Sequence, residues 1–451
     1  MPPSSASAAH RWLPWLAAVA FFLQTLDGTI LNTALPGMAR ALGVAPLALQ
    51  PVVVAYLLTA TVCIPASGWL ADRFGTRRVF MAALALFGLG SLAAALAPSV
   101  PALVAARVVQ GAGGALMLPV ARLAVLRTFP REELIKVLSL VAMAGLVGPL
   151  LGPPLGGMLV QWASWRWIFA VNLPVVVLGL WLARRHMPDR RHDAGRFDAR
   201  GFGLFATAVV GLTVGLGEGG LPRPGWLAAA ALALALFVWH TRRAQRPLFA
   251  PSLLRVRSFA VGLSGNLWAR LGSGAMPFVI PLYLQLSLGW PPARAGLALV
   301  PVVLGAMAAK VVAPSLVRRL GYRRVLVGNT LTLAALIALF AAVGSATPTP
   351  LLLTLLAAFG LVNSMQFSAM NTVTLMELDA AQAGGGNALL SVVMQLSASL
   401  GVSSATLLLG AFGGLAAPGA FAATFVALAL LAAGSATVFG RLPADAAPLR
   451  Q

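Results

Sequence analysis

The sequence has few charged residues and almost none of the groups that catalysis or metal binding needs. Only 10% of its 451 residues are charged, with 11 acidic residues, 4 histidines and one cysteine, Cys63. A lone cysteine cannot form a disulfide within the chain, and no Cys and His cluster has the spacing of a zinc site. The apolar segments contain no paired carboxylates and no Ser, His and Asp set, so we expect no enzyme, no metal and no cofactor.

Long apolar segments make up most of the chain. The composition is 59% hydrophobic, and many runs of about 18 residues or more could each cross about 30 Å of hydrocarbon as a helix. The runs are too long for barrel strands and lack their alternation, so helices are the form that satisfies the backbone in lipid. The sequence predicts an all-α integral membrane protein.

Turn signals divide the chain into fourteen predicted spans. They lie near 15–36, 50–71, 79–97, 101–125, 137–160, 167–184, 201–217, 225–241, 259–285, 294–316, 323–343, 349–374, 384–411 and 417–440. The seventh and eighth are the shortest, and element boundaries drawn from sequence are uncertain by several residues.

The 32 basic residues are divided unevenly between the predicted loops. With the N-terminus inside, 24 fall in inner segments, 4 in outer loops and 4 within spans. By the positive-inside rule this predicts that both termini lie in the cytoplasm. We expect the membrane to be a bacterial inner membrane. The net charge of +21 then reflects topology beside anionic lipid, so we expect membrane lipid as a partner, and no nucleic acid.

One sequence segment occurs twice. GWLADRFGTRRV (68–79) recurs as PSLVRRLGYRRV (314–325), 246 residues later. The repeat predicts two homologous six-helix bundles, over residues 1–200 and 246–451, with the two helices of 201–245 as an insert. Repeats around a midplane site are typical of secondary transporters. We expect a monomer.

Four motifs resemble those of a known family. The loop with Gly68, Asp72, Arg73, Gly75, Arg77 and Arg78 resembles the signature loop of the major facilitator superfamily, and RVVQGAGG (107–114) resembles its basic motif. The segment with Gly148, Gly152, Pro153, Gly156 and Gly157 is similar to its antiporter motif, and LDGTILNTALP (26–36) to a motif of its fourteen-helix drug:proton antiporters. The resemblance implies the major-facilitator fold with two inserted helices.

An aspartate, Asp27, stands in the middle of the first span. A carboxylate at the bilayer centre costs about 3 kcal/mol or more. At 1.5 Å per residue, Asp27 lies about 18 Å from Trp15 and Arg107 about 9 Å from Pro101, so both occupy the outer half of the membrane. The family fold would set the first and fourth helices side by side. We therefore predict proton coupling by Asp27 and Arg107, with a static ion pair as the alternative.

Further polar residues within the spans are candidates for binding a solute. Together with Asp27 and Arg107 they are Asn32, Gln110, Arg270, Asn363, Gln366 and Asn371. If Arg107 and Arg270 both face a cavity, the site would favour a carboxylate or phosphate group. The polar set of the twelfth span is explained equally by substrate binding and by hydrogen bonds between helices.

Two motifs have an expected mechanical role. In the loop after the second span, the Asp72 carboxylate can accept bonds from a helix N-terminus and from guanidinium groups, which makes it a candidate gating latch or a plain topology signal. The small residues of 148–157 give the fifth span a smooth face for close helix packing. By resemblance this face seals the protein against leak.

The preferred function is a proton-coupled antiporter that exports small molecules, as in multidrug efflux, by alternating access. The alternative is an exporter of an anionic metabolite or metal chelate recognised by Arg107 and Arg270. An ATP-driven pump is disfavoured, because Lys136 and Lys310 lack the context of a phosphate-binding loop. A channel would need a continuous polar pore, and a sensor would need an output domain, which we do not find in the sequence.

Overall fold

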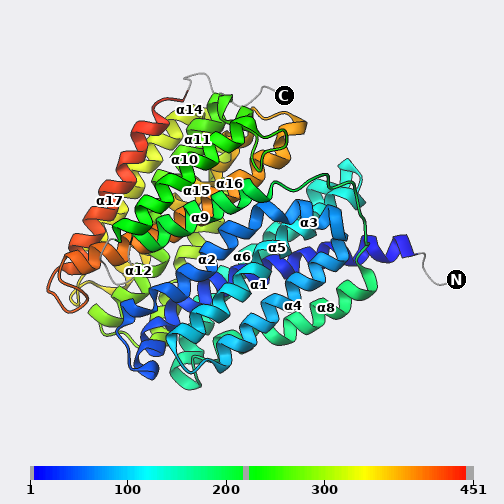
Figure 1. Cartoon of the computed structure of the whole chain (residues 1–451). Helices are drawn as coiled ribbons and strands as arrows, with labels where there is room; N and C mark the ends of the chain where they lie inside the picture. Colours follow the sequence, from blue (N-terminus) through cyan, green and yellow to red (C-terminus); the bar gives the residue numbers. More distant parts are fainter. Residues whose placement is uncertain (1–4, 217–222, 443–451) are drawn as a thin grey trace. The chain divides into compact units, whose positions relative to one another are not determined.

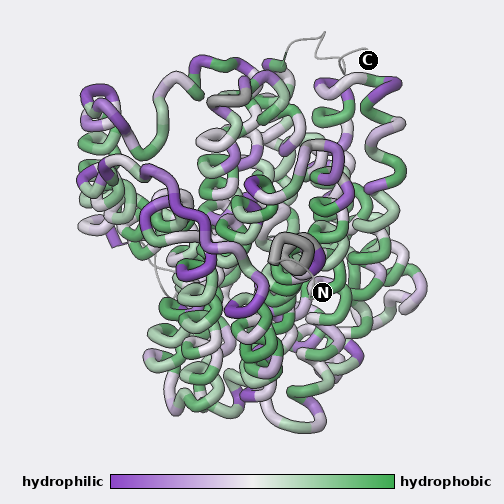
Figure 2. The backbone as a smooth tube through the Cα atoms, turned by 90° about the vertical axis from the view of Figure 1, so that its right-hand side faces the viewer, coloured by the Kyte–Doolittle hydropathy of each residue, from purple (hydrophilic) through white to green (hydrophobic). Residues whose placement is uncertain are grey.

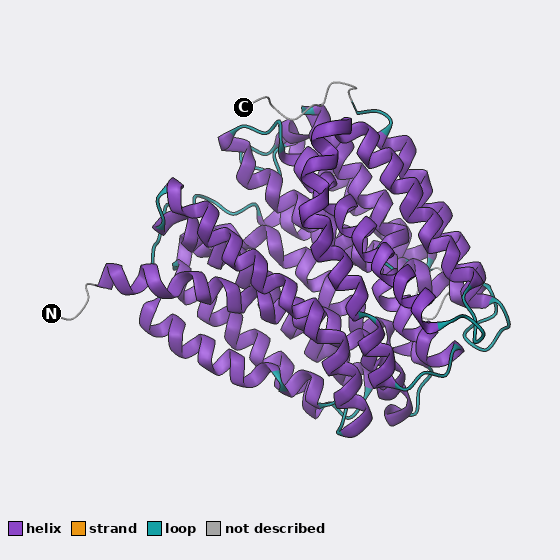
Figure 3. Cartoon of the chain, turned by 180° about the vertical axis from the view of Figure 1, so that it is seen from behind, coloured by secondary structure: helices purple, strands orange, loops and turns teal. Residues whose placement is uncertain are grey.

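The structure is a computed structural model that describes residues 5–216 and 223–442. Residues 1–4, 217–222 and 443–451 lie outside the described residues. They include the last residue of the predicted seventh span and part of the loop that follows it. Within the described ranges every regular element is helical, without a strand (Figure 3). The predicted all-α class is confirmed.

Internal contacts divide the chain into two compact units. The first runs to Phe197 and also includes Pro291–Leu297. Its helices, labelled in Figure 1 where there is room, are α1 (Ser5–Leu42), α2 (Gln50–Cys63), α3 (Ser67–Phe74), α4 (Thr76–Leu96), α5 (Val100–Thr128), α6 (Arg131–Trp162), α7 (Trp167–Ala170), α8 (Asn172–His186) and the start of α13 (Pro292–Ala298). Helix α1 packs along α6, and α4 along α5.

The second unit comprises Asp198–Trp290 and the chain from Ala298. Its helices are α9 (Ala199–Gly215), α10 (Pro224–Arg243), α11 (Arg257–Ser273), α12 (Met276–Leu282), α14 (Val300–Leu339), α15 (Thr349–Leu375), α16 (Ala380–Ala411) and α17 (Ala420–Phe439). The two predicted inserted helices correspond to α9 and α10, which pack on each other. The three-part division at 200 and 245 stays a prediction.

Eleven helical stretches of the described chain are long and apolar enough to cross a membrane. One of them, 292–342, contains two predicted spans. The predicted seventh span is the shorter helix α9, and the ninth is divided into α11, α12 and a π-helical turn at Tyr283–Ser287. The structure is therefore compatible with fourteen spans. Figure 2 shows the hydrophobic stretches along these helices.

The internal repeat is also present in the backbone. Gly75 has φ 97° and ψ 144° between α3 and α4. Its counterpart Gly321 has φ 77° and ψ 160° and interrupts α14. Residues with a side chain rarely adopt this conformation, so both repeats require glycine at the same position. The repeated sequence thus encodes the same bend in each unit.

Apolar side chains lie both inside and outside the bundle. In the first unit Leu23, Phe80 and Phe87 are fully buried in one core cluster. Leu89 and Leu96 on the same helix α4 are 60% and 70% exposed. An outer surface with such side chains suits lipid, which is as apolar as the side chains themselves.

Candidate functional site

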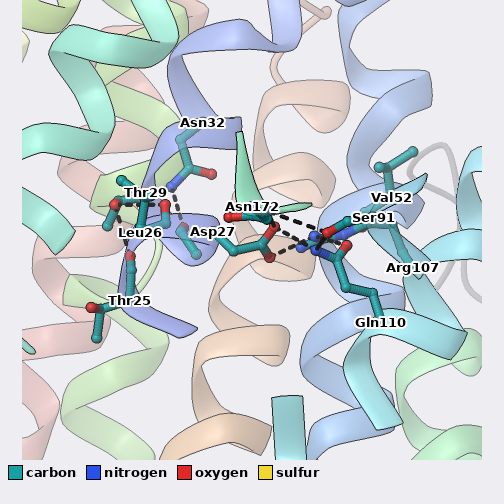
Figure 4. Close-up of polar contacts among 11 residues, drawn as sticks. Thr25, Leu26, Asp27, Thr29, Asn32, Val52, Ser91, Arg107, Gln110 and Asn172 are labelled. Carbon is teal, nitrogen blue, oxygen red and sulfur yellow. Dashed lines mark hydrogen bonds and ion pairs between the residues drawn. The ribbon is translucent and has the colours of Figure 1, made fainter. Parts of the chain in front are cut away.

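Asp27 lies at the centre of a buried polar network in the first unit (Figure 4). Its carboxylate, on α1, is 1% exposed. Its Oδ2 accepts a hydrogen bond from Nη1 of Arg107 at 2.6 Å, and its Oδ1 accepts one from Nε2 of Gln110 at 2.7 Å. Both partners come from α5, so the structure brings together the two charges that the sequence pairs.

The guanidinium of Arg107 makes further contacts within this network. Its Nε donates to the carbonyl of Val52 on α2 at 3.2 Å, and its Nη1 also donates to Oε1 of Gln110 at 2.7 Å. The ring of Tyr56 lies beneath it, 4.4 Å from Cζ. A cation over an aromatic face is stabilised further, especially when it is desolvated.

Two residues of the network were missed by the sequence analysis. Ser91 on α4 accepts from Nε2 of Gln110 at 2.8 Å, and from Nδ2 of Asn172 at 3.3 Å. Asn172, the first residue of α8, also donates to Oδ1 of Asp27 at 3.4 Å. Both are fully buried. Their polarity within apolar spans was the available signal, but it did not identify the carboxylate they face.

The arrangement of donors fits an ionised carboxylate. Three side-chain donors point at Asp27, and one of them is a cation. Such charge-assisted bonds are short and roughly twice as strong as neutral ones. Removing either charge would leave the other buried and unpaired, at a cost of about 3–5 kcal/mol. A proton on Asp27 would therefore change the energy of the whole network.

Asn32, on the same helix, does not belong to this network. Its Nδ2 donates to the carbonyl of Gly28, one turn earlier, at 3.3 Å.

The predicted antiporter motif on α6 packs against α1, the helix that carries Asp27. Thr29 donates to the carbonyl of Gly148 at 3.4 Å, and Thr33 donates to that of Pro153 at 3.2 Å. A Cβ at Gly152 would collide with Thr29, and one at Gly156 with the backbone of Ile30; Gly157 packs in the same way on Pro292. Glycine is needed here because the backbones approach closely.

The predicted gating loop is held by ion pairs within its own unit. Oδ1 of Asp72 lies 2.6 Å from Nη2 of Arg127 at the end of α5. Asp189 lies 3.6 Å from Arg78 and 3.9 Å from Arg77. Gly68 and Arg73 are exposed. The segment after α8 also binds the loop, since the N–H of residue 192 donates to the carbonyl of Asp72.

Arg270 on α11 is the buried cation of the second unit. It is 9% exposed, and its Cζ lies 3.7 Å from the centre of the Phe367 ring. Its Nε makes one long hydrogen bond, 3.4 Å, to Asn266. Among the described residues no carboxylate pairs with it. This guanidinium therefore differs from that of Arg107, which has a carboxylate partner.

The polar residues of the predicted twelfth span, now α15, fall into two groups. Gln366 is fully buried and bonds Asn329 and Thr330 of α14, each at 2.8 Å. The side-chain oxygens of Asn363 and Asn371 are buried without a partner in the described chain. No group of three or more His, Cys, Asp or Glu that could hold a metal ion occurs among the described residues.

The family model of the Major Facilitator Superfamily matches residues 17–402 and, in a second match, 262–450. The chain belongs to this superfamily. It is 48% identical over 452 residues to a protein of Cronobacter sakazakii named "Putative multidrug resistance protein MdtD", covering 96% of this chain and 95% of that one. A protein of the same name from Escherichia coli strain SE11 is 45% identical over the same shares of both chains.

Solved structures of two other transporters share the fold. A D-xylose-proton symporter has a TM-score of 0.70 at 16% identity, covering 97% of this chain and 99% of that one. The nucleoside transporter NupG has a TM-score of 0.67 at 13% identity, covering 95% and 98%. As a member of the Major Facilitator Superfamily, the protein is a multi-pass membrane transporter and not an enzyme.

Proposed function

We propose that the protein is a proton-coupled antiporter that exports small molecules by alternating access, with Asp27 as the proton carrier. The observation that supports this is the ion pair of Asp27 with Arg107, buried between two helices that are long and apolar enough to span a membrane. Ionisable residues inside membrane spans are expensive, and they are typical of substrate and proton pathways.

The pair can act as a switch because its attraction depends on one proton. An ionised Asp27 accepts from Arg107 and Gln110 at once. A protonated carboxyl has no charge and less acceptor capacity, so its hold on Arg107 falls. A proton from outside would release substrate, and loss of that proton to the cytoplasm would reset the site. Each proton that enters gains about 2.3 kcal/mol per 100 mV.

Export as the direction is supported by the relatives, whose names describe multidrug resistance. The close fit of α6 on α1 supports coupling to protons, because a helix face without free space next to Asp27 leaves little room for protons to leak. With this function we propose an inner-membrane location, both termini in the cytoplasm, a monomer, and Asp72 with its loop as the gate.

Transport in proteoliposomes tests the proposal. The solutes are a matched cation, neutral compound and carboxylate, each measured with and without an imposed proton gradient. The gradient should drive export by the wild type, and Asp27→Asn should abolish this drive. Glu132→Gln, which removes an exposed carboxylate at the start of α6, should leave it intact. Gradient-driven export by Asp27→Asn equal to that of the wild type would refute the role of Asp27.

A second candidate is export of an anionic metabolite or a metal chelate. Of the two arginines expected to bind an anion, Arg107 already has a carboxylate partner, whereas Arg270 has none among the described residues. A buried guanidinium without a counter-ion is suited to bind a carboxylate bidentately.

Arg270→Gln should then abolish transport of the carboxylate solute and spare the cation and the neutral compound. Arg122→Gln, which removes an exposed arginine within α5, is the control. Unchanged carboxylate transport by Arg270→Gln would exclude this candidate.

A further inference from the structure

Helix α10 is the spanning helix with the least protein contact in the described chain. Only 11% of its most apolar 18-residue stretch is buried inside the protein. In the other ten spanning stretches the buried share ranges from 24% to 56%. Its buried residues, Ala230 and Ala233, lie on the side toward α9. Most of its surface therefore faces the surroundings of the protein.

The exposed face of α10 is hollowed. A groove with a volume of about 660 Å³ runs along it, with Ala231 and Ala235 among its lining residues. The same groove reaches Trp239, Arg242 and Arg243 in the last turns of the helix. The small side chains of Ala231 and Ala235 make room for the groove. Trp239, Arg242 and Arg243 form its end.

The charged end of the groove has no acidic partner. Both arginines are exposed and neither forms an ion pair with a described residue. The guanidinium of Arg243 lies 4.3 Å from the centre of the Trp239 ring. Tryptophan and arginine gather at the level of the lipid headgroups, so this end of the helix matches a membrane interface.

The length of the groove matches one leaflet. Eleven residues separate Ala231 from Arg242, which at 1.5 Å per residue is about 16 Å. Half of the hydrocarbon thickness is about 15 Å. A ligand with a negative group at the arginines would thus extend an apolar tail to the middle of the bilayer.

We infer that the groove of α10 binds one anionic phospholipid, with its phosphate at Arg242 and Arg243 and an acyl chain along Ala235 and Ala231. This molecule matches three features of the site: two exposed cations, a tryptophan at headgroup level, and an apolar groove one leaflet long. The inserted helix α10 thus acts as a lipid-binding element, independently of the transport mechanism.

Native mass spectrometry of the purified full-length protein tests this site. The probes are phosphatidylglycerol and, as the zwitterionic control, phosphatidylcholine. Each arginine at an anionic surface contributes about fivefold in affinity. Arg242→Gln with Arg243→Gln should therefore weaken phosphatidylglycerol binding roughly 30-fold. Phosphatidylcholine binding should fall by much less, because its choline group offsets the charge of the phosphate. Thermal unfolding checks that each variant is folded.

Helix α8 offers a matched control. Its end carries Arg184 and Arg185, and Arg185 lies 4.5 Å from the ring of Trp181, at the same spacing as on α10. Arg184→Gln with Arg185→Gln should keep the binding. Equal losses in both double variants would mean general surface electrostatics and would overturn the inference, as would a wild type that does not distinguish the two lipids.

Filling the groove tests its apolar part. Ala235→Trp retains both arginines and should still lower phosphatidylglycerol binding by about tenfold. Unchanged binding would overturn the assignment of the acyl chain. The rival occupant is a second copy of the chain: if Ala235→Cys forms disulfide-linked dimers in membranes and the dimer carries no bound lipid, the groove is a protein interface.

Discussion

Gln110 on α5 donates its side-chain amide to Asp27 on α1 across 2.7 Å. The oxygen of the same amide accepts from Arg107 at 2.7 Å. Since one end of an amide donates and the other accepts, these two contacts fix its orientation. In this orientation Gln110 favours a negative Asp27 and a positive Arg107, so the three side chains act as one unit.

Replacing Gln110 with leucine should destabilise the protein. The substitution leaves Asp27 and Arg107 each short of a buried partner, which costs about 1–3 kcal/mol per group. Thermal unfolding in detergent measures the loss. Gln24→Leu is the control, because Oε1 of Gln24 has no partner within the described chain. An equal loss in both variants would contradict the assigned role of Gln110.

The two charges of the pair should be strongly coupled. Asp27→Asn or Arg107→Gln alone leaves one buried charge unpaired and should cost about 3–5 kcal/mol, whereas the double variant should cost clearly less than the sum. A double-mutant cycle of unfolding free energies provides the measurement. Additive costs would mean that the two side chains do not interact in the folded protein.

The repeated glycines should differ in their tolerance of alanine. Each has a positive φ whose occupation by alanine costs on the order of 1–3 kcal/mol. A Cβ at Gly75 would in addition collide with Asp189, whereas one at Gly321 meets open space. Gly75→Ala should therefore lower the unfolding temperature more than Gly321→Ala, as measured side by side. The reverse order would be inconsistent with the geometry of this loop.

Asp198 should stabilise the protein in a pH-dependent way. Burial by itself would raise the pKa of this carboxyl, but hydrogen bonds from Gly201, His240 and Leu248 outweigh it and hold the pKa below its ordinary value. The stabilisation is then fully present above the unfolded pKa of about 3.9, and it is lost as pH falls through the lower folded pKa.

The matching variant is Asp198→Asn. It should unfold at a lower temperature than the wild type at pH 7, and the difference should shrink as the pH falls below about 4. A difference that is the same at all pH values would exclude the carboxylate charge as its cause.

The sequence predicts part of the site well. Distance along each helix and the family motifs were enough to pair Asp27 with Arg107, because helical rise is regular. Ser91 and Asn172 were missed because sequence does not reveal which face of an apolar helix meets a carboxylate on another. For the same reason sequence alone could not find the partners of Gln366, which come from α14.

The fold, like the site, could be predicted only in part from the sequence. Apolar length identified the helices, but the local breaks depend on backbone details that length does not reveal. The predicted ninth span contains Pro277 and Pro281, and it is divided into α11 and α12. Gly321 has non-helical backbone angles inside α14, so the tenth and eleventh predicted spans are two helical segments that meet at a kink.

The central claim is that Asp27 couples transport to protons. The most direct test compares substrate exchange without a gradient and gradient-driven accumulation in proteoliposomes containing Asp27→Asn. If Asp27 carries the proton, exchange continues in this variant while the gradient no longer drives accumulation. If accumulation follows the gradient as in the wild type, the pair of Asp27 and Arg107 only holds the helices together, and the proposed mechanism is wrong.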